Sequence, residues 1–204
     1  MKTTLKILSL SVFLMLSCNK DDDATGFVPT LPAITQTGAN TFGCYAGNIL
    51  ITPRNGTGTF NSEDEGMILW GGYPNNTDYY EIDIHDYKSE RTSSILIHVQ
   101  SAHLNGIGDY IINASNGFNS IDGLDNTYIN CRVWRDELGG GYYNYVSFEN
   151  SGTINITRYD FSEHIISGTF SANLRNFNHP YDIIEITDGR FDIDWDTNTS
   201  VIFP

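Results

Sequence analysis

Short runs in which apolar and polar residues alternate dominate the chain from residue 41 to its end. Three runs carry an apolar face each, formed by Tyr80, Ile82 and Ile84, by Ile95, Ile97 and Val99, and by Ile129, Cys131 and Val133. Because successive side chains of a strand point to opposite faces, each run predicts a β-strand with one side in the core. Similar runs at 109–113, 143–149, 153–159 and 165–175 predict one antiparallel all-β domain of about ten strands. That number of strands fits either a β-sandwich or a barrel-like sheet.

Two of the three cysteines are predicted to point into the core. The pair Gly47-Asn48 suits a two-residue turn, and a hairpin there places Cys44 opposite Ile51 on an apolar face. Cys131 lies on the apolar face of its own run. The two thiols either form a disulfide or pack as separate buried side chains, and the sequence leaves both interpretations open.

A second predicted hairpin brings acidic residues together near the end of the chain. Residues 188–189, Asp-Gly, are typical of a two-residue turn, and a turn there sets Ile186 opposite Phe191. Under this register one face carries four carboxylates: Glu185, Asp192, Asp194 and Asp196. Since directly opposed carboxylates repel each other, a Ca²⁺ ion would stabilise the arrangement. The alternative, which we favour, is a solvated edge on which Arg190 eases the repulsion.

The start of the chain follows a different pattern. Lys2 and Lys6 precede an uninterrupted stretch of apolar residues and serines from 7 to 16, which is too short to span a bilayer and is typical of a signal peptide. Residues 14–18, Leu-Met-Leu-Ser-Cys, resemble a lipobox, in which cleavage leaves the cysteine as an acylated N-terminus. We therefore expect residues 1–17 to be a lipoprotein signal peptide and Cys18 to carry the lipid.

The segment after Cys18 is expected to be a tether. Residues 20–23, Lys-Asp-Asp-Asp, resemble the export signal that sends lipoproteins of the Bacteroidota type to the outer face of the outer membrane. They could also simply keep a linker solvated. Prolines and poor periodicity favour a flexible tether over residues 18–40, followed by the all-β domain over 41–204. The expected location is the outer membrane, with the domain exposed at the cell surface.

The charge of the chain excludes some partners. It has 25 acidic and 11 basic residues and a formal net charge of −14. Nucleic acids and anionic lipid surfaces are bound through clusters of Lys and Arg, which this sequence does not have. We therefore expect no nucleic acid partner, and membrane contact through the lipid anchor alone.

Several segments resemble a known family. Residues 31–44, followed by a short hairpin, resemble the opening of a family of Bacteroidota lipoprotein domains of unknown function. Four later segments resemble the strand motifs of that family in the same order: Gly108–Ile112, Gly152–Thr157, Ile166–Ser171 and Ile186–Phe191. The resemblance covers residues 31–195 and implies an all-β domain on a lipid tether. It brings no catalytic residues.

Tyrosines supply the candidate ligand-binding side chains. Tyr142, Tyr143 and Tyr145 follow the glycine turn at 139–141 and could stack on sugar rings, with Tyr73, Tyr79 and Tyr80 as a second aromatic group. Strand alternation sends about half of them into the core.

Three classes of function remain open. A surface module that binds a glycan or a protein ranks first, because the sequence shows no zinc-like spacing, nucleophile elbow or phosphate loop. A structural or assembly subunit of an envelope complex ranks second. A glycan hydrolase ranks third, since it needs two carboxylates roughly 5–9 Å apart beside a groove.

Overall fold

The computed structural model describes residues 27–60, 63–72 and 77–204. The predicted signal peptide, Cys18, the acidic run 20–23 and Tyr73 lie outside these residues. Eleven strands and three short helices make up the described chain. The strands are β1 (Thr41–Ala46), β2 (Ile49–Ile51), β3 (Met67–Gly71), β4 (Tyr79–Asp86), β5 (Ser93–Gln100), β6 (Gly108–Ile112), β7 (Tyr128–Arg135), β8 (Gly141–Val146), β9 (Gly152–Asp160), β10 (Ile165–Asn176) and β11 (Ile183–Asp194). The helices are α1 (Ala102–Asn105) and the 3-10 turns η1 (Ser120–Asp122) and η2 (Asn198–Ser200).

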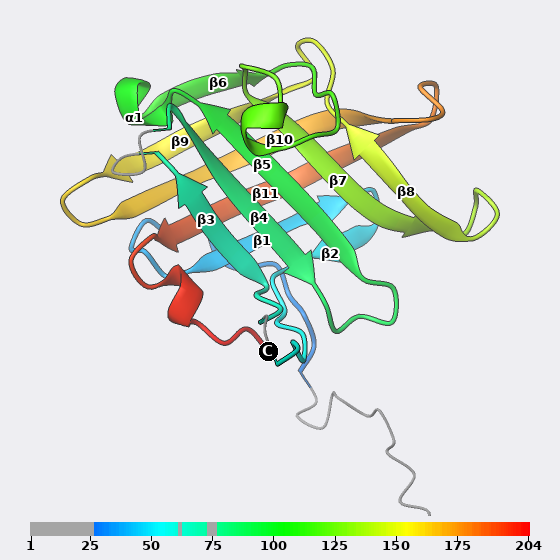
Figure 1. Cartoon of the computed structure of the whole chain (residues 1–204), viewed down its shortest axis with the longest axis horizontal. Coiled ribbons are helices and arrows are strands. Elements are labelled where there is room, and N and C mark those ends of the chain that lie inside the picture. Colours follow the sequence, from blue (N-terminus) through cyan, green and yellow to red (C-terminus); the bar gives the residue numbers. More distant parts are fainter. Residues whose placement is uncertain (1–26, 61–62, 73–76) are drawn as a thin grey trace, which may run out of the picture.

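The strands form a single antiparallel sheet that curls into a half-barrel (Figure 1). The main order is β2-β1-β11-β10-β8-β7-β5-β4-β3, and β9 pairs with β10 and with β6. Strand β10 joins the two halves, because it pairs with β9 along its first part and with β8 at its end. We call β3, β4, β5, β7 and β8 the front half, and the other six strands the back half. The predicted all-β domain is confirmed.

The core lies on the concave side of the curled sheet, between the two halves. The three alternating runs of the sequence place their apolar residues there, and Ile82, Ile97 and Ile129 are fully buried. Phe42, Ile186 and Phe191 of the back half belong to the same apolar cluster. Burial of apolar area on both inner faces is the main force that holds the sheet curled.

The first predicted hairpin is confirmed and the second is wrong. Cys44 pairs with Ile51 as expected. Strand β11, in contrast, runs without a turn through Asp188 and Gly189, between β1 and β10. The pairing with both neighbours shifts at this point, which is the signature of a β-bulge.

The bulge explains why the apolar pattern suggested a turn. Ile184 and Ile186 face the core before it, and Phe191 and Ile193 face the core after it, so the inward positions change from even to odd numbers. A two-residue hairpin and a bulge both shift the inward-facing positions by one residue, so the apolar pattern is the same for the two structures. Asp188 has a positive φ of 55°, and a Cβ on Gly189 would lie 2.5 Å from the carbonyl oxygen of Phe170. The Asp-Gly pair therefore permits the bulge, and the partners on both sides of β11 keep the strand continuous.

The last residues of the expected tether pack against the domain. The carboxylate of Asp192 accepts hydrogen bonds from the hydroxyl of Thr35 (2.6 Å) and from the backbone N–H groups of Thr37 (2.9 Å), Gly38 (2.8 Å) and Ala39 (3.3 Å). We call residues 35–39 the N-terminal clasp. The ordered domain thus begins before residue 41.

Candidate functional site

Outward-facing side chains of the front half form rows across the strands. Directly opposed residues on antiparallel strands share a face, so the pairing fixes which side chains are neighbours. The rows are Glu81, His98 and Tyr128, then Asp83, Leu96, Asn130 and Val146, then His85, Ser94, Arg132 and Asn144. We call the first the closed row, the second the middle row, and Ser94, Arg132 and Asn144 of the third the open row.

The closed row holds a buried carboxylate next to a buried histidine. Glu81 is fully buried, and its Oε1 lies 2.9 Å from His98 Nδ1. The other ring nitrogen lies 3.1 Å from Gln100 Oε1, and the Gln100 amide nitrogen donates to Asp78, which fixes the amide orientation. Both ring nitrogens of His98 therefore lie within hydrogen-bond distance of an oxygen atom, and the ring is held from its two sides.

The Glu81 carboxylate also holds a loop against the sheet. Oε1 of Glu81 also accepts hydrogen bonds from the backbone N–H of Ser120 (2.6 Å) and from the hydroxyl of Tyr128 (3.3 Å). Burial, together with the Glu81 carboxylate, raises the pKa of Tyr128, which therefore stays a donor. The loop at 113–127 consequently lies over the closed row, and its residues Ser115 and Phe118 also contact Asn130 of the middle row.

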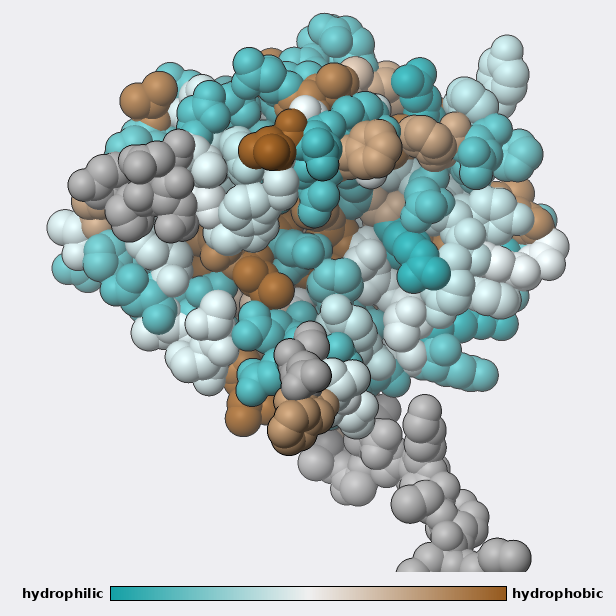
Figure 2. Space-filling model, in the orientation of Figure 1, coloured by the Kyte–Doolittle hydropathy of each residue, from teal (hydrophilic) through white to brown (hydrophobic). Residues whose placement is uncertain are grey.

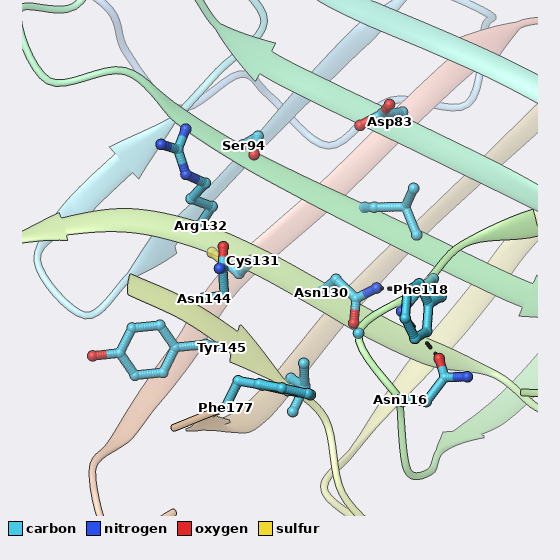
Figure 3. Close-up of a pocket in the computed structure, with 13 residues that line it drawn as sticks. Asp83, Ser94, Asn116, Phe118, Asn130, Cys131, Arg132, Asn144, Tyr145 and Phe177 are labelled. Atoms are coloured by element: carbon cyan, nitrogen blue, oxygen red, sulfur yellow. Dashed lines mark hydrogen bonds between the residues drawn. The ribbon is translucent and has the colours of Figure 1, made fainter. Parts of the chain in front are cut away.

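A hollow lies beside this loop on the outer face of the sheet. It has a volume of about 390 Å³, and the middle and open rows form its floor. Asn130 donates from its amide nitrogen to the carbonyl oxygen of Phe118 (3.1 Å), which holds the loop as one wall. Figure 3 shows Asn130 near the centre, with Arg132 and Phe118 on opposite sides. We call this hollow the outer-face groove.

The polar side chains of the open row have no hydrogen-bond partners within the described residues. Arg132 and Asn144 are exposed and Ser94 is half-buried. Within the described chain their side-chain polar atoms form no hydrogen bond or ion pair, and the guanidinium of Arg132 lies 4.1 Å from the centre of the Tyr142 ring. Asp83 in the middle row differs, because His85 pairs with it at 3.1 Å. The open row thus offers donors and acceptors to a ligand.

Two aromatic rings border the groove. Phe118 on the loop is 62% exposed and Phe177, after β10, is 54% exposed. The ring of Phe177 packs against Gly117, where a Cβ would lie 3.2 Å from it. In Figure 2 apolar side chains gather over this loop, among the polar residues of the same face. The groove therefore combines polar side chains on its floor with apolar rings at its rim, a combination typical of ligand sites.

The structure separates the three tyrosines that were predicted to bind a ligand. Tyr142 is 38% exposed and stacks on Arg132 beside the open row. Tyr143 points to the other face, and Tyr145 is fully buried in the core. In the second aromatic group, Tyr79 stacks on His98 with ring centres 4.4 Å apart, and the hydroxyl of Tyr80 lies 3.0 Å from that of Tyr159.

The four carboxylates suggested for Ca²⁺ do not come together. Because β11 bulges instead of turning, Glu185 pairs with Asn173, and Asp192 with Thr41 and Ser167. Asp194 accepts the N–H of Asp196, and Asp196 also pairs with His164. Among the described residues no group of three or more Asp, Glu, His or Cys side chains could hold a metal ion.

Cys44 and Cys131 are free thiols in the structure, and both are buried. Burial raises the pKa of Cys131 to about 12, and burial followed by the nearby Cys131 raises that of Cys44 well above its usual value. Neither thiol is therefore a nucleophile at neutral pH.

The open row was not predicted from the sequence, although the alternating pattern contained part of the signal. The alternation that placed Cys131 inward also placed Asn130 and Arg132 outward. Ser94, Asn144 and Phe177 join them only through the strand order, which the alternation does not specify. Phe118 and Asn116 come from a loop with no pattern of its own.

No family model, curated protein or solved structure matches the chain. In the part of the chain that the structure describes, no helix is long and apolar enough to cross a membrane.

Proposed function

We propose that this chain is a lipid-anchored binding module of the bacterial cell surface, and that it holds a glycan across the outer-face groove. The lipobox at 14–18 and the acidic run at 20–23 support the anchor at Cys18 and the location in the outer membrane. The resemblance to the Bacteroidota lipoprotein family supports the same placement.

The open row is the observation that carries the proposal. Ser94, Arg132 and Asn144 stand side by side on three neighbouring strands, with polar groups that the described fold does not use. Sugar hydroxyl groups both donate and accept hydrogen bonds, so amide, hydroxyl and guanidinium groups suit them. The C–H faces of sugar rings suit aromatic rings such as Phe118 and Phe177.

Binding is better supported than hydrolysis. A glycosidase needs an acid and a second carboxylate on either side of the bond that it cleaves. Asp83 is the single carboxylate among the described residues that line the groove, and it is paired with His85.

A glycan panel tests the proposal. The full-length chain, purified in detergent, is offered polysaccharides and oligosaccharides, and a variant with Ser94→Ala and Asn144→Ala serves as the comparison. We expect at least one glycan to bind the natural chain, and the double variant to bind it about tenfold more weakly with unchanged thermal stability. Equal binding of the glycan by both proteins would show that the groove is not the binding site. If the chain binds an envelope protein and no glycan, the function as an assembly subunit is favoured.

A further inference from the structure

The arginines of the described chain fall into two groups. Five of them lie within ion-pair distance of a carboxylate: Arg54, Arg91, Arg135, Arg158 and Arg190. Arg132 and Arg175 are both exposed and pair with no carboxylate of the described residues. The chain has 25 acidic residues, so potential partners are abundant. These two cations are therefore left unpaired by the fold.

Both unpaired arginines lie on the outer face beside the groove. Arg132 on β7 is opposite Asn144, and Arg175 on β10 is opposite Val146, so they flank β8 from its two sides. Strands are spaced by about 4.8 Å and rise about 3.3 Å per residue, which sets the two Cα atoms about 12 Å apart. Arginine side chains are long enough for both guanidinium groups to reach one extended ligand.

Each of the two guanidinium groups rests on an aromatic ring. The Cζ of Arg132 lies 4.1 Å from the centre of the Tyr142 ring, and that of Arg175 lies 6.0 Å from the centre of the Phe148 ring. Stacking uses the face of a guanidinium and leaves its N–H edges free. Those edges match a carboxylate or a sulfate, to which arginine donates two parallel hydrogen bonds.

The carboxylates near the two arginines already have partners in the fold. Asp83 is the carboxylate in the groove, and His85 pairs with it at 3.1 Å. Asp182, in the turn between β10 and β11, accepts hydrogen bonds from the hydroxyl of Tyr145 (2.6 Å) and the amide of Asn176 (3.0 Å). The formal net charge of −14 repels a polyanion from the rest of the surface, so an acidic ligand is attracted only locally.

We infer that the glycan held in the outer-face groove is acidic, with a carboxylate or sulfate group on Arg132 and a second one on Arg175. This inference rests on the proposed function and specifies its ligand class. It predicts that charge, and not only the pattern of hydroxyl groups, determines affinity.

Matched acidic and neutral oligosaccharides test the inference by calorimetry with the full-length chain in detergent. The probes are oligomers of galacturonic acid against their methyl esters, and sulfated against unsulfated galactan oligomers, which separate the carboxylate from the sulfate. We expect one acidic probe to bind about tenfold more tightly than its neutral partner, and added salt to reduce that preference. Arg132→Gln should abolish the preference, Arg175→Gln should reduce it, and Arg158→Gln, a paired arginine of the back half, should retain it.

The outcomes distinguish this inference from the proposed function. If the natural chain and Arg132→Gln both bind an acidic probe and its neutral partner with equal affinity, the inference of an acidic ligand is wrong. The proposed glycan site is retained in that case. Absence of binding to every oligosaccharide overturns both. Binding of poly-glutamate as tightly as the best acidic oligosaccharide overturns the glycan and indicates an acidic protein segment.

Discussion

Two polar sites on the outer face of the sheet, one on each half, differ in how far the fold satisfies their hydrogen bonds. On the back half, Asp192 faces outward on β11 but is only 1% exposed, because the N-terminal clasp covers it and Ser167 adds a hydrogen bond at 2.7 Å. On the front half, the open row has no covering segment among the described residues, and its polar groups stay unpaired. Outward polarity alone thus does not identify a site. The hydrogen-bond partners within the fold make the difference. A carboxylate whose hydrogen bonds are all made inside the fold has a structural role, and a row of polar side chains without such partners is a candidate for ligand binding.

The largest expected effect comes from the closed row, which is saturated although it lies beside the open one. Glu81→Gln replaces a buried carboxylate that accepts hydrogen bonds from Ser120 and Tyr128 and lies against His98, and we expect a loss of about 3 kcal/mol in the free energy of unfolding. Denaturant titration measures it. Glu185→Gln, an exposed glutamate on β11, is the control and should change stability by less than about 0.5 kcal/mol. Equal effects of the two variants would mean that the buried Glu81 carboxylate contributes nothing to stability.

The clasp gives the next largest effect. Asp192→Asn replaces an acceptor of several N–H and O–H groups by an amide that faces some of them with its own donors, so we expect a loss of about 2 kcal/mol. Released residues 35–39 should also become sensitive to protease, and peptide mapping of the cleavage sites reports this. Asp194→Asn is the matched control on the same strand. Unchanged stability together with unchanged proteolysis in Asp192→Asn would contradict the structural role of the clasp.

Acid should weaken the clasp without any mutation. Burial raises the pKa of Asp192, but the hydrogen bonds from Thr35, Thr37, Ser167 and Gly38 outweigh it and lower the pKa to about 2. Since the folded value lies below the ordinary value of 3.8, this carboxylate contributes its full stability above about pH 4 and loses it as the pH falls towards 2. The contribution is roughly 2 kcal/mol. The stability gap between the natural chain and Asp192→Asn should therefore narrow in acid, and a constant gap would argue against the lowered pKa.

The smallest stability effect is expected at the open row, and a pair of arginines makes the contrast sharp. Arg158 on β9 donates to the carbonyl oxygen of Gln36 and pairs with Asp160, so it belongs to the structural face. Arg158→Gln should lower stability by up to about 1 kcal/mol and leave ligand binding intact. Arg132→Gln should do the reverse, with unfolding free energy unchanged within about 0.5 kcal/mol and weaker binding. Denaturant titration measures the stability of both variants, and calorimetry measures their ligand affinity. A loss of stability in Arg132→Gln would mean that Arg132 has a structural role instead of a binding role.

Alternation along the chain predicted the strands and their inward faces, because a period of two depends only on local geometry. It could not distinguish a hairpin at Asp188-Gly189 from a bulge, since both move the inward positions by one residue. What separates them is whether β11 has partners on both sides. That is a property of β1 and β10, far away in the sequence.

The candidate site was less predictable than the fold for a similar reason. Arg132 could be recognised as outward-facing from the sequence, but its neighbours Ser94 and Asn144 depend on the order β5-β7-β8. The burial of Glu81 and His98 was equally hidden, because a loop distant in sequence covers them. Tyr145 shows the converse, since a tyrosine next to a glycine turn proved to be core.

Arginine footprinting shows which arginines the ligand covers. The full-length chain is treated with a dicarbonyl reagent, with and without the tightest-binding oligosaccharide, and the modified arginines are identified by mass spectrometry. We expect Arg132 and Arg175 to be modified fastest in the free protein. Bound ligand should slow the modification of Arg132 most and leave that of Arg91 and Arg158 unchanged. If the ligand binds and the reactivity of Arg132 stays the same, the outer-face groove is not where this protein holds its ligand.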